Sequence, residues 1–205
     1  MINVLLGMKM EPSDSDLLLK QATAFKRAGD INSAIGALRQ AYAIIAKGHI
    51  LYGVDPFLRL PLYLQEDGRN DEAWMEFNKL ILEGYPNQLP NAGVRAMEHS
   101  KIYDKMRLFL NREGRNEESI IYGVLSILAC ARGLNLQKRC DEFDSITTRE
   151  SVEVALKPLL KKSRMISQLE QFVEFVCREL AIPSKIDLKG AGKRTRALIS
   201  HFHSE

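Results

Sequence analysis

Apolar residues recur every three or four positions through most of the 205-residue chain, in stretches separated by short polar turns. This spacing is typical of amphipathic α-helices, each of which buries one face. Three of the turns share a pattern: an apolar stretch ends in charged residues, a glycine follows, and a second amphipathic stretch begins. They lie at residues 29–34, 68–73 and 114–119. The pattern predicts an all-α protein that contains three antiparallel helix–turn–helix units.

The residues of these turns have a physical role in ending one helix and starting the next. Gly29, Gly68 and Gly114 can adopt a positive φ just past a helix end without steric cost. The Asp or Asn that comes next is expected to cap the second helix, and acidic residues in its first turn favour the positive end of the helix dipole. These acidic residues are Asp71, Glu72, Glu117 and Glu118.

The three units resemble the tetratricopeptide repeat family. The residues at the family's small and apolar positions are Ala22, Gly29, Ala34, Leu38 and Ala41 in the first unit, Pro61, Gly68, Ala73, Phe77 and Leu80 in the second, and Arg107, Gly114, Ser119, Gly123 and Ser126 in the third. The glycines are 39 and 46 residues apart, whereas the family period is about 34. The resemblance covers about residues 15–132 and implies an irregular right-handed solenoid. The alternative is a non-repetitive helical bundle whose hairpins share turn chemistry.

The sequence divides into four segments: an N-terminal extension (1–13), three repeat-like hairpins (14–132), C-terminal capping helices (133–183) and a basic tail (184–205). Thr147 and Glu150 have the spacing of a capping box that opens a helix. Apolar residues then recur from Leu159 to Leu180, which predicts one amphipathic helix ended by Pro183. Because a repeat array exposes an apolar face at its end, we expect these helices to cap it. The alternative is a homodimer helix, since Phe172 and Phe175 widen its apolar face.

The tail after residue 184 carries more basic than acidic side chains, although the formal net charge of the whole chain is only +3. The basic residues are Lys185, Lys189, Lys193, Arg194 and Arg196. Such a cluster can bind polyanions by releasing their counterions, or it can be a solvated, mobile terminus. Residues 190–192, Gly-Ala-Gly, are expected to form a flexible link.

The resemblance also implies a concave groove, lined by the first helix of each unit, that receives a peptide or a helix of a partner protein. Carried over by position, its partner-binding residues are Leu19, Thr23, Lys26, Leu58, Leu62, Gln65, Lys101, Leu108 and Asn111, interspersed with Asp16, Asp55 and Asp104. Leucines among polar residues suit a peptide held by apolar anchors. The family's carboxylate-clamping subset uses Lys, Arg and Asn where this chain has Asp16, Leu19 and Thr23, which argues against that mode. Trp74, the only tryptophan, is expected to pack between units rather than to contact a partner.

Motifs for chemistry are missing from the sequence. It has no glycine-rich phosphate loop, no GxSxG and no zinc-binding spacing. His201 and His203 could meet Cys177, but nothing else supports a metal site. We therefore expect no catalytic residue, cofactor or metal. Cys130, Cys140 and Cys177 are expected to be reduced and to act as small hydrophobic residues, as in cytoplasmic proteins.

Composition agrees with a globular chain, at 45% hydrophobic and 27% charged residues. The N-terminus lacks the features of a signal peptide, and no run approaches the length of a membrane span. The sequence thus predicts a cytoplasmic protein–protein interaction module with an adaptor, chaperone-like or regulatory role. The alternative is a nucleic-acid-associated protein that uses the basic tail.

Overall fold

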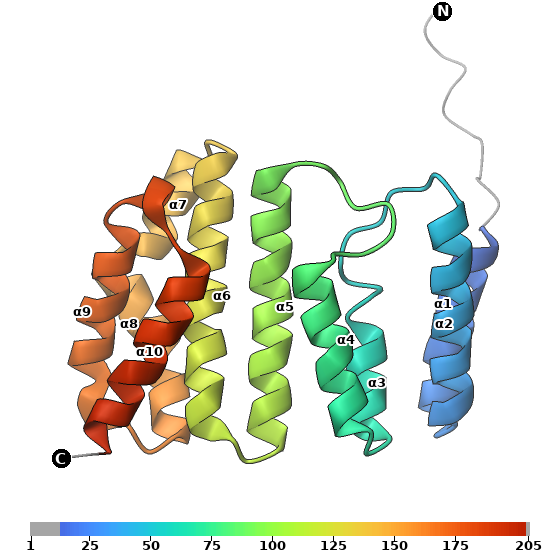
Figure 1. Cartoon of the computed structure of the whole chain (residues 1–205), viewed down its shortest axis with the longest axis horizontal. Coiled ribbons are helices and arrows are strands. Elements are labelled where there is room, and N and C mark those ends of the chain that lie inside the picture. The colour runs from blue at the N-terminus through green and yellow to red at the C-terminus, as the bar shows by residue number, and fades with distance from the viewer. Residues whose placement is uncertain (1–12, 204–205) are drawn as a thin grey trace, which may run out of the picture. The chain divides into compact units, whose positions relative to one another are not determined.

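The computed structural model describes residues 13–203, and this part of the chain contains ten α-helices, two short 3-10 helices and no strand. The helices are α1 (Asp14–Arg27), α2 (Ile31–Lys47), α3 (Arg59–Glu66), α4 (Asn70–Leu82), α5 (Ala92–Arg112), α6 (Asn116–Leu136), α7 (Cys140–Thr147), α8 (Arg149–Lys162), η1 (Ile166–Gln168), α9 (Leu169–Leu180), η2 (Pro183–Lys185) and α10 (Leu188–Phe202). The prediction of an all-α protein is confirmed (Figure 1). The proposed N-terminal extension, apart from Ser13, lies outside the described residues.

The chain forms two compact units. Among the described residues, unit 1 comprises residues 13–76 and 85–87, and unit 2 comprises residues 77–84 and 88–203. Within unit 1, α1 and α2 form an antiparallel hairpin (Figure 1), and small residues such as Ala22 and Ala41 are fully buried in it. The segment after α2 folds back through Phe57, whose ring stacks on Tyr85 with centroids 4.7 Å apart.

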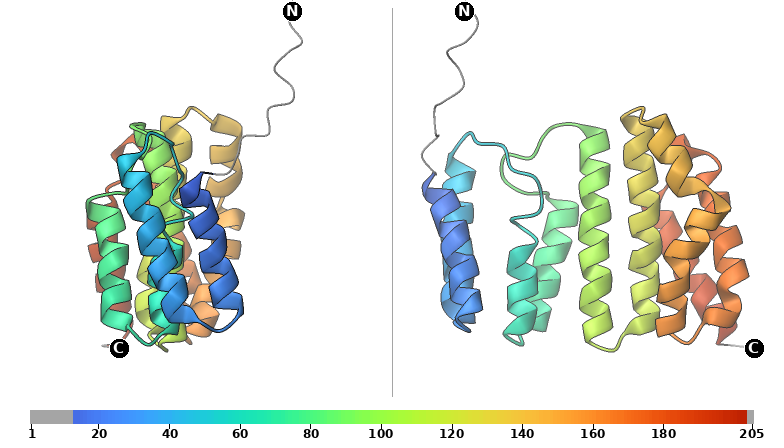
Figure 2. Two further views of the ribbon diagram at one scale, coloured as in Figure 1. Left: turned by 90° about the vertical axis from the view of Figure 1, so that its right-hand side faces the viewer. Right: turned by 180° about the vertical axis from the view of Figure 1, so that it is seen from behind.

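Unit 2 is built around α6. This helix runs antiparallel to α5, and it also contacts α7, α8, α9 and α10 (Figures 1 and 2). The core contains large side chains from each layer, among them Phe109, Leu128, Leu156 and Phe172, all fully or almost fully buried. Phe175 is also buried, at 7% exposure, so neither phenylalanine named for a homodimer interface lies on the surface of this unit.

The three predicted glycine turns have one common backbone geometry. Gly29, Gly68 and Gly114 have φ values of 82°, 78° and 75°, and in each case the following N–H donates to the carbonyl five residues earlier, at 2.8–3.0 Å. This bond satisfies a carbonyl that the ending helix leaves without a partner. The same bond follows Lys138 and Arg164, whose φ values are 57° and 61°. Five helix ends therefore share this geometry, and two of them do so without glycine.

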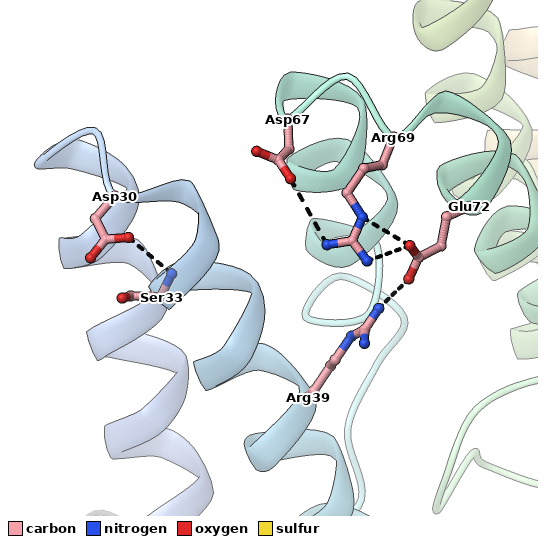
Figure 3. Close-up of polar contacts among 6 residues, drawn as sticks. All are labelled: Asp30, Ser33, Arg39, Asp67, Arg69 and Glu72. Atoms are coloured by element: carbon pink, nitrogen blue, oxygen red, sulfur yellow. Dashed lines mark hydrogen bonds and ion pairs between the residues drawn. The ribbon is translucent and has the colours of Figure 1, made fainter.

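Capping of the second helices differs from the prediction. Asp30 does cap α2, because its Oδ1 accepts a hydrogen bond from Ser33 N at 3.0 Å (Figure 3). Asn70 and Asn116 do not cap, because each is already the first residue of its helix. The arginine before each asparagine instead binds the glutamate three residues on: Arg69 binds Glu72, and Arg115 binds Glu118 through two bonds of 2.8 Å.

These arginine–glutamate contacts recur at a third turn and extend between helices. Arg139 binds Glu142 in the same way at the start of α7. In unit 1, Glu72 also pairs with Arg39 of α2 (Figure 3). A positive residue thus fixes the first-turn carboxylate that stabilises each helix N-terminus.

Two predictions about the C-terminal helices are wrong in detail. Thr148, not Thr147, caps α8 by accepting from Ser151 N at 3.1 Å, while Thr147 donates to the carbonyl of Phe143. The apolar pattern from Leu159 to Leu180 is not one helix: it breaks where Arg164 adopts its positive φ, between α8 and α9. The periodicity carries across this turn because residues on both sides face the same core.

The prediction of a flexible Gly-Ala-Gly link is also wrong, since residues 190–192 lie within α10. This helix packs on α6 through a face in which Ala191, Thr195 and Ile199 are buried (Figure 1). Gly192 lies in this contact region, where an added methyl group would rest against Leu125. The segment proposed as a tail is part of the core of unit 2.

Helix α6 is the one helix among the described residues that is long and apolar enough to cross a membrane. Its most apolar 18-residue window has a mean hydropathy of 1.5 and is 61% buried in the structure. The sequence prediction considered only unbroken apolar runs, and α6 is interrupted by polar residues, so this helix was not singled out. Burial of α6 as the central helix of unit 2 accounts for its composition.

Candidate functional site

The predicted groove residues of unit 1 are largely occupied by contacts between α1 and α3. Leu19 and Leu58 are buried, at 7% and 3% exposure. Arg59 donates to the carbonyl of Leu19 at 3.2 Å and to Thr23 Oγ1 at 3.4 Å. Leu19 and Leu58 are therefore core residues, and Thr23 helps to join the two helices.

The remaining predicted residues of unit 1 lie nearer the surface. Lys26 pairs with Glu66 at 3.0 Å and lies 5.1 Å from the centroid of the Tyr63 ring. Leu62 and Gln65 are half-buried. In the same unit, Trp74 is half-buried on α4.

In unit 2, two of the three predicted groove residues line a cleft. This cleft, called here the α5–α6–α8 cleft, has a volume of about 470 Å³. Leu108 and Asn111 contribute to its α5 wall, whereas Lys101 is exposed outside it. The full lining is Asp104, Arg107, Leu108, Asn111, Gly123, Ser126, Ile127, Ala155, Pro158, Leu159 and Lys162.

The cleft combines an apolar floor with a polar rim. Gly123 brings α8 close to α6, since a methyl group there would overlap the side chain of Leu159. At the rim, Arg107 donates to Asp104 at 2.7 and 3.0 Å. Asn111 Oδ1 is buried and has no hydrogen-bond partner among the described residues. A buried acceptor left without a donor costs roughly 1–3 kcal/mol.

The sequence did not predict the α8 wall of the cleft, because the repeat resemblance places groove residues only on the first helix of each unit. Ala155, Pro158 and Lys162 lie more than 40 residues beyond α5 in the chain. Their apolar spacing did predict a helix, but no local signal indicates which surface that helix covers.

The five basic residues proposed for polyanion binding are all exposed, on η2 and α10. Acidic side chains lie among them. Arg194 pairs with Glu179 at 2.7 Å, which raises the pKa of its guanidinium. The pKa of Glu118 is lowered, mainly by its hydrogen bonds to Arg115 and also by the nearby charge of Arg196. The surface around α10 is therefore of mixed charge.

The histidines and cysteines of the described residues do not gather into a metal-binding cluster. His203 contacts Glu117 at 3.0 Å, and the ring of His201 lies 5.6 Å from that of Phe202. Within residues 13–203, no three His, Cys, Asp or Glu side chains are grouped to hold a metal ion. All three cysteines are free thiols. Cys140 is exposed as the first residue of α7, so it does not act as a buried hydrophobic residue.

Comparison with known proteins finds no matching family model, no matching curated protein and no matching solved structure. The resemblance to tetratricopeptide repeats therefore remains a prediction from the residues of the turns.

Proposed function

We propose that this chain is a non-catalytic protein–protein interaction module, built from irregular tetratricopeptide-like hairpins, that binds an extended peptide segment of a partner. The observation that carries the proposal is the α5–α6–α8 cleft, because it lies at the predicted groove positions Leu108 and Asn111. The shared geometry of the turns after Gly29, Gly68 and Gly114 supports the repeat interpretation.

The chemistry of the cleft favours a peptide with an apolar anchor. Its lining offers aliphatic atoms of Leu108, Ile127 and Pro158, and burial of one large apolar side chain contributes about 1.5–3 kcal/mol. Asn111 Oδ1 is buried without a donor, and a turn of this side chain toward the cleft would let it accept from a peptide backbone N–H, which every residue except proline carries. The Asp104–Arg107 pair at the rim provides both charge signs for side chains next to the anchor.

The test begins with selection of 12-residue peptides from a random displayed library against the purified full chain. NMR titration of a selected peptide then maps the binding site. We expect chemical-shift changes in α5, α6 and α8 around the cleft. Leu108→Ser should weaken binding at least about tenfold, and Asn111→Ala by a similar factor, since each removes one to two kcal/mol of contact.

Val154→Ser is the matched control, because Val154 lies on α8 but is 67% exposed and does not line the cleft. It should leave affinity unchanged. Circular dichroism checks that each variant remains helical. Binding that maps outside the cleft, or a folded Leu108→Ser variant that binds as tightly as the wild type, would contradict the proposal.

A second candidate function, association with nucleic acid, is favoured by the exposure of all five basic residues on η2 and α10. Truncation before α10 is not a clean test, because this helix covers α6. The exposed charges can be removed instead in the triple variant Lys185→Gln, Lys189→Gln, Lys193→Gln. Binding to a DNA or RNA oligonucleotide should fall steeply with salt and be lost in this variant. Binding that is insensitive to salt would exclude this function.

A further inference from the structure

A second pocket lies at the opposite end of the α5–α6 hairpin from the α5–α6–α8 cleft. It has a volume of about 310 Å³ and is lined by the start of α5, the end of α6 and the start of α10 (Figure 1 labels these helices). Its residues are Pro90, Ala92, Arg95, Ala96, His99, Arg132, Leu136 and Leu188. We call it the arginine pocket. All of it belongs to unit 2.

Cationic and imidazole groups converge on the arginine pocket. Arg95 and His99 are one turn apart on α5 and therefore share a face. Arg132 reaches the same pocket from α6. Across residues 13–203, neither arginine forms an ion pair, whereas five other arginines of unit 2 do. Two guanidinium groups are thus available to bind a ligand.

Acidic groups do not neutralise this pocket. Asp187, the residue before Leu188, is exposed and does not line the pocket. Glu98 is buried at 6% exposure and accepts a hydrogen bond from Gln88 at 2.9 Å. It lies next to His99 in the chain but does not line the pocket. The side chains that line it include no carboxylate. The local charge therefore favours an anionic group.

The rest of the lining is apolar and half open to solvent. Leu136 is 46% exposed, and Leu188 is half-buried beside it. Arginine forks bind carboxylate and phosphate oxygens in two-point geometry, and a volume near the lower end of ligand pockets suits a compact molecule. We propose that the arginine pocket binds a small organic oxyanion, a carboxylate or phosphate monoester, whose oxygens contact Arg95 and Arg132 and whose apolar part packs on Leu136 and Leu188.

His99 makes this binding dependent on pH. Burial is the main cause that lowers its pKa, and the charges of Arg95 and Arg132 lower it further, while Glu98 acts in the opposite direction. Tyr103, whose ring lies 6.3 Å away, adds no charge near pH 7, and burial raises its pKa further. The surroundings of His99 therefore favour its neutral form. A carboxylate in the pocket keeps its charge in this range and favours protonation of the imidazole, so its binding should tighten as the pH falls below 6.5, the ordinary value.

The experiment is an NMR and calorimetric titration of the full chain with three probes of equal chain length: hexanoate, hexyl phosphate and hexan-1-ol. At least one anionic probe should bind about tenfold or more tightly than the alcohol, which shares the apolar part but lacks the charge. The shifted resonances should include those of His99 and of the ends of α5 and α6. Whether hexanoate or hexyl phosphate binds more tightly identifies the preferred oxyanion.

Arg95→Gln and Arg132→Gln should each weaken binding of the anionic probe by about tenfold. Arg132→Lys should bind more tightly than Arg132→Gln but less tightly than the wild type, because lysine keeps the charge without the two-point geometry of the guanidinium. Arg178→Gln is the matched control, since Arg178 is exposed on α9 away from the pocket. Because the substituted arginines are exposed, circular dichroism should show unchanged folding. Equal binding of hexan-1-ol and the anions, or wild-type affinity in both glutamine variants, would overturn the proposal. Resonances that shift only outside this pocket would do the same.

Discussion

Replacing Lys138 by glycine is expected to stabilise unit 2, although glycine usually destabilises a fold. Lys138 has a φ of 57° and ends α6 in the geometry that glycine provides at three other turns. An L-residue in this conformation costs roughly 1–2 kcal/mol. Glycine removes that cost but adds chain entropy to the unfolded state, worth about 0.4–1 kcal/mol. The net gain in unfolding free energy is about 0.5–1 kcal/mol.

Gly114→Ala is the reverse experiment in the same unit. A methyl group at Gly114 would meet no atom within 4 Å, so its cost comes only from the φ of 75°. We expect a loss of about 0.5–1 kcal/mol. Lys138→Ala serves as a control that removes the exposed side chain and keeps an L-residue, and it should be nearly neutral.

Urea unfolding followed by far-UV circular dichroism measures these changes, with the free energies taken from midpoints at constant m-value. The two compact units can unfold separately, so only the transition that shifts in both Gly114→Ala and Lys138→Gly is compared. If Lys138→Gly were less stable than Lys138→Ala, the left-handed conformation at Lys138 would be refuted. Arg164→Gly, at a residue with a φ of 61°, is an independent test of the same effect.

The remaining predictions concern packing and pH. Gly133→Ala should destabilise unit 2 by at least about 2 kcal/mol, because the added methyl would lie 2.9 Å from the backbone nitrogen of Met97. Gly36 lies in a helix, where an added methyl meets no atom within 4 Å, so Gly36→Ala should stabilise unit 1 by about 0.5–1 kcal/mol. Equal changes of the two variants in urea unfolding would contradict this packing. His99 should titrate below 6.5 by NMR without ligand. Because the pKa of His99 is lower in the folded chain, the unfolded chain binds the proton at a higher pH. The unfolding free energy should therefore decrease as the pH falls through 6.5 toward the pKa of the folded state. His99→Gln should remove that part of the pH dependence. An unshifted titration would show that the imidazole is solvated.

Local features of the sequence determined the helical class and the three glycine turns. An amphipathic period and a residue that tolerates positive φ are properties of a few neighbouring residues, and Gly29, Gly68 and Gly114 express them directly. The turns at Lys138 and Arg164 escaped prediction because nothing about a basic side chain favours that conformation. There, contacts made by the flanking helices outweigh the local preference.

The candidate sites depended on which helices pair. Leu108 and Asn111 were predicted from the repeat pattern, but only the tertiary structure brings α8 across them to form a cleft. Similarly, Arg95 and Arg132 are far apart in the sequence and meet because α5 and α6 run antiparallel. The amphipathic pattern shows that a helix buries one face, and packing among all helices of the unit selects the surface that covers it. For this reason the sequence by itself determined the helical class and the glycine turns, and the tertiary structure decided the breaks between the C-terminal helices and where polar and charged side chains converge.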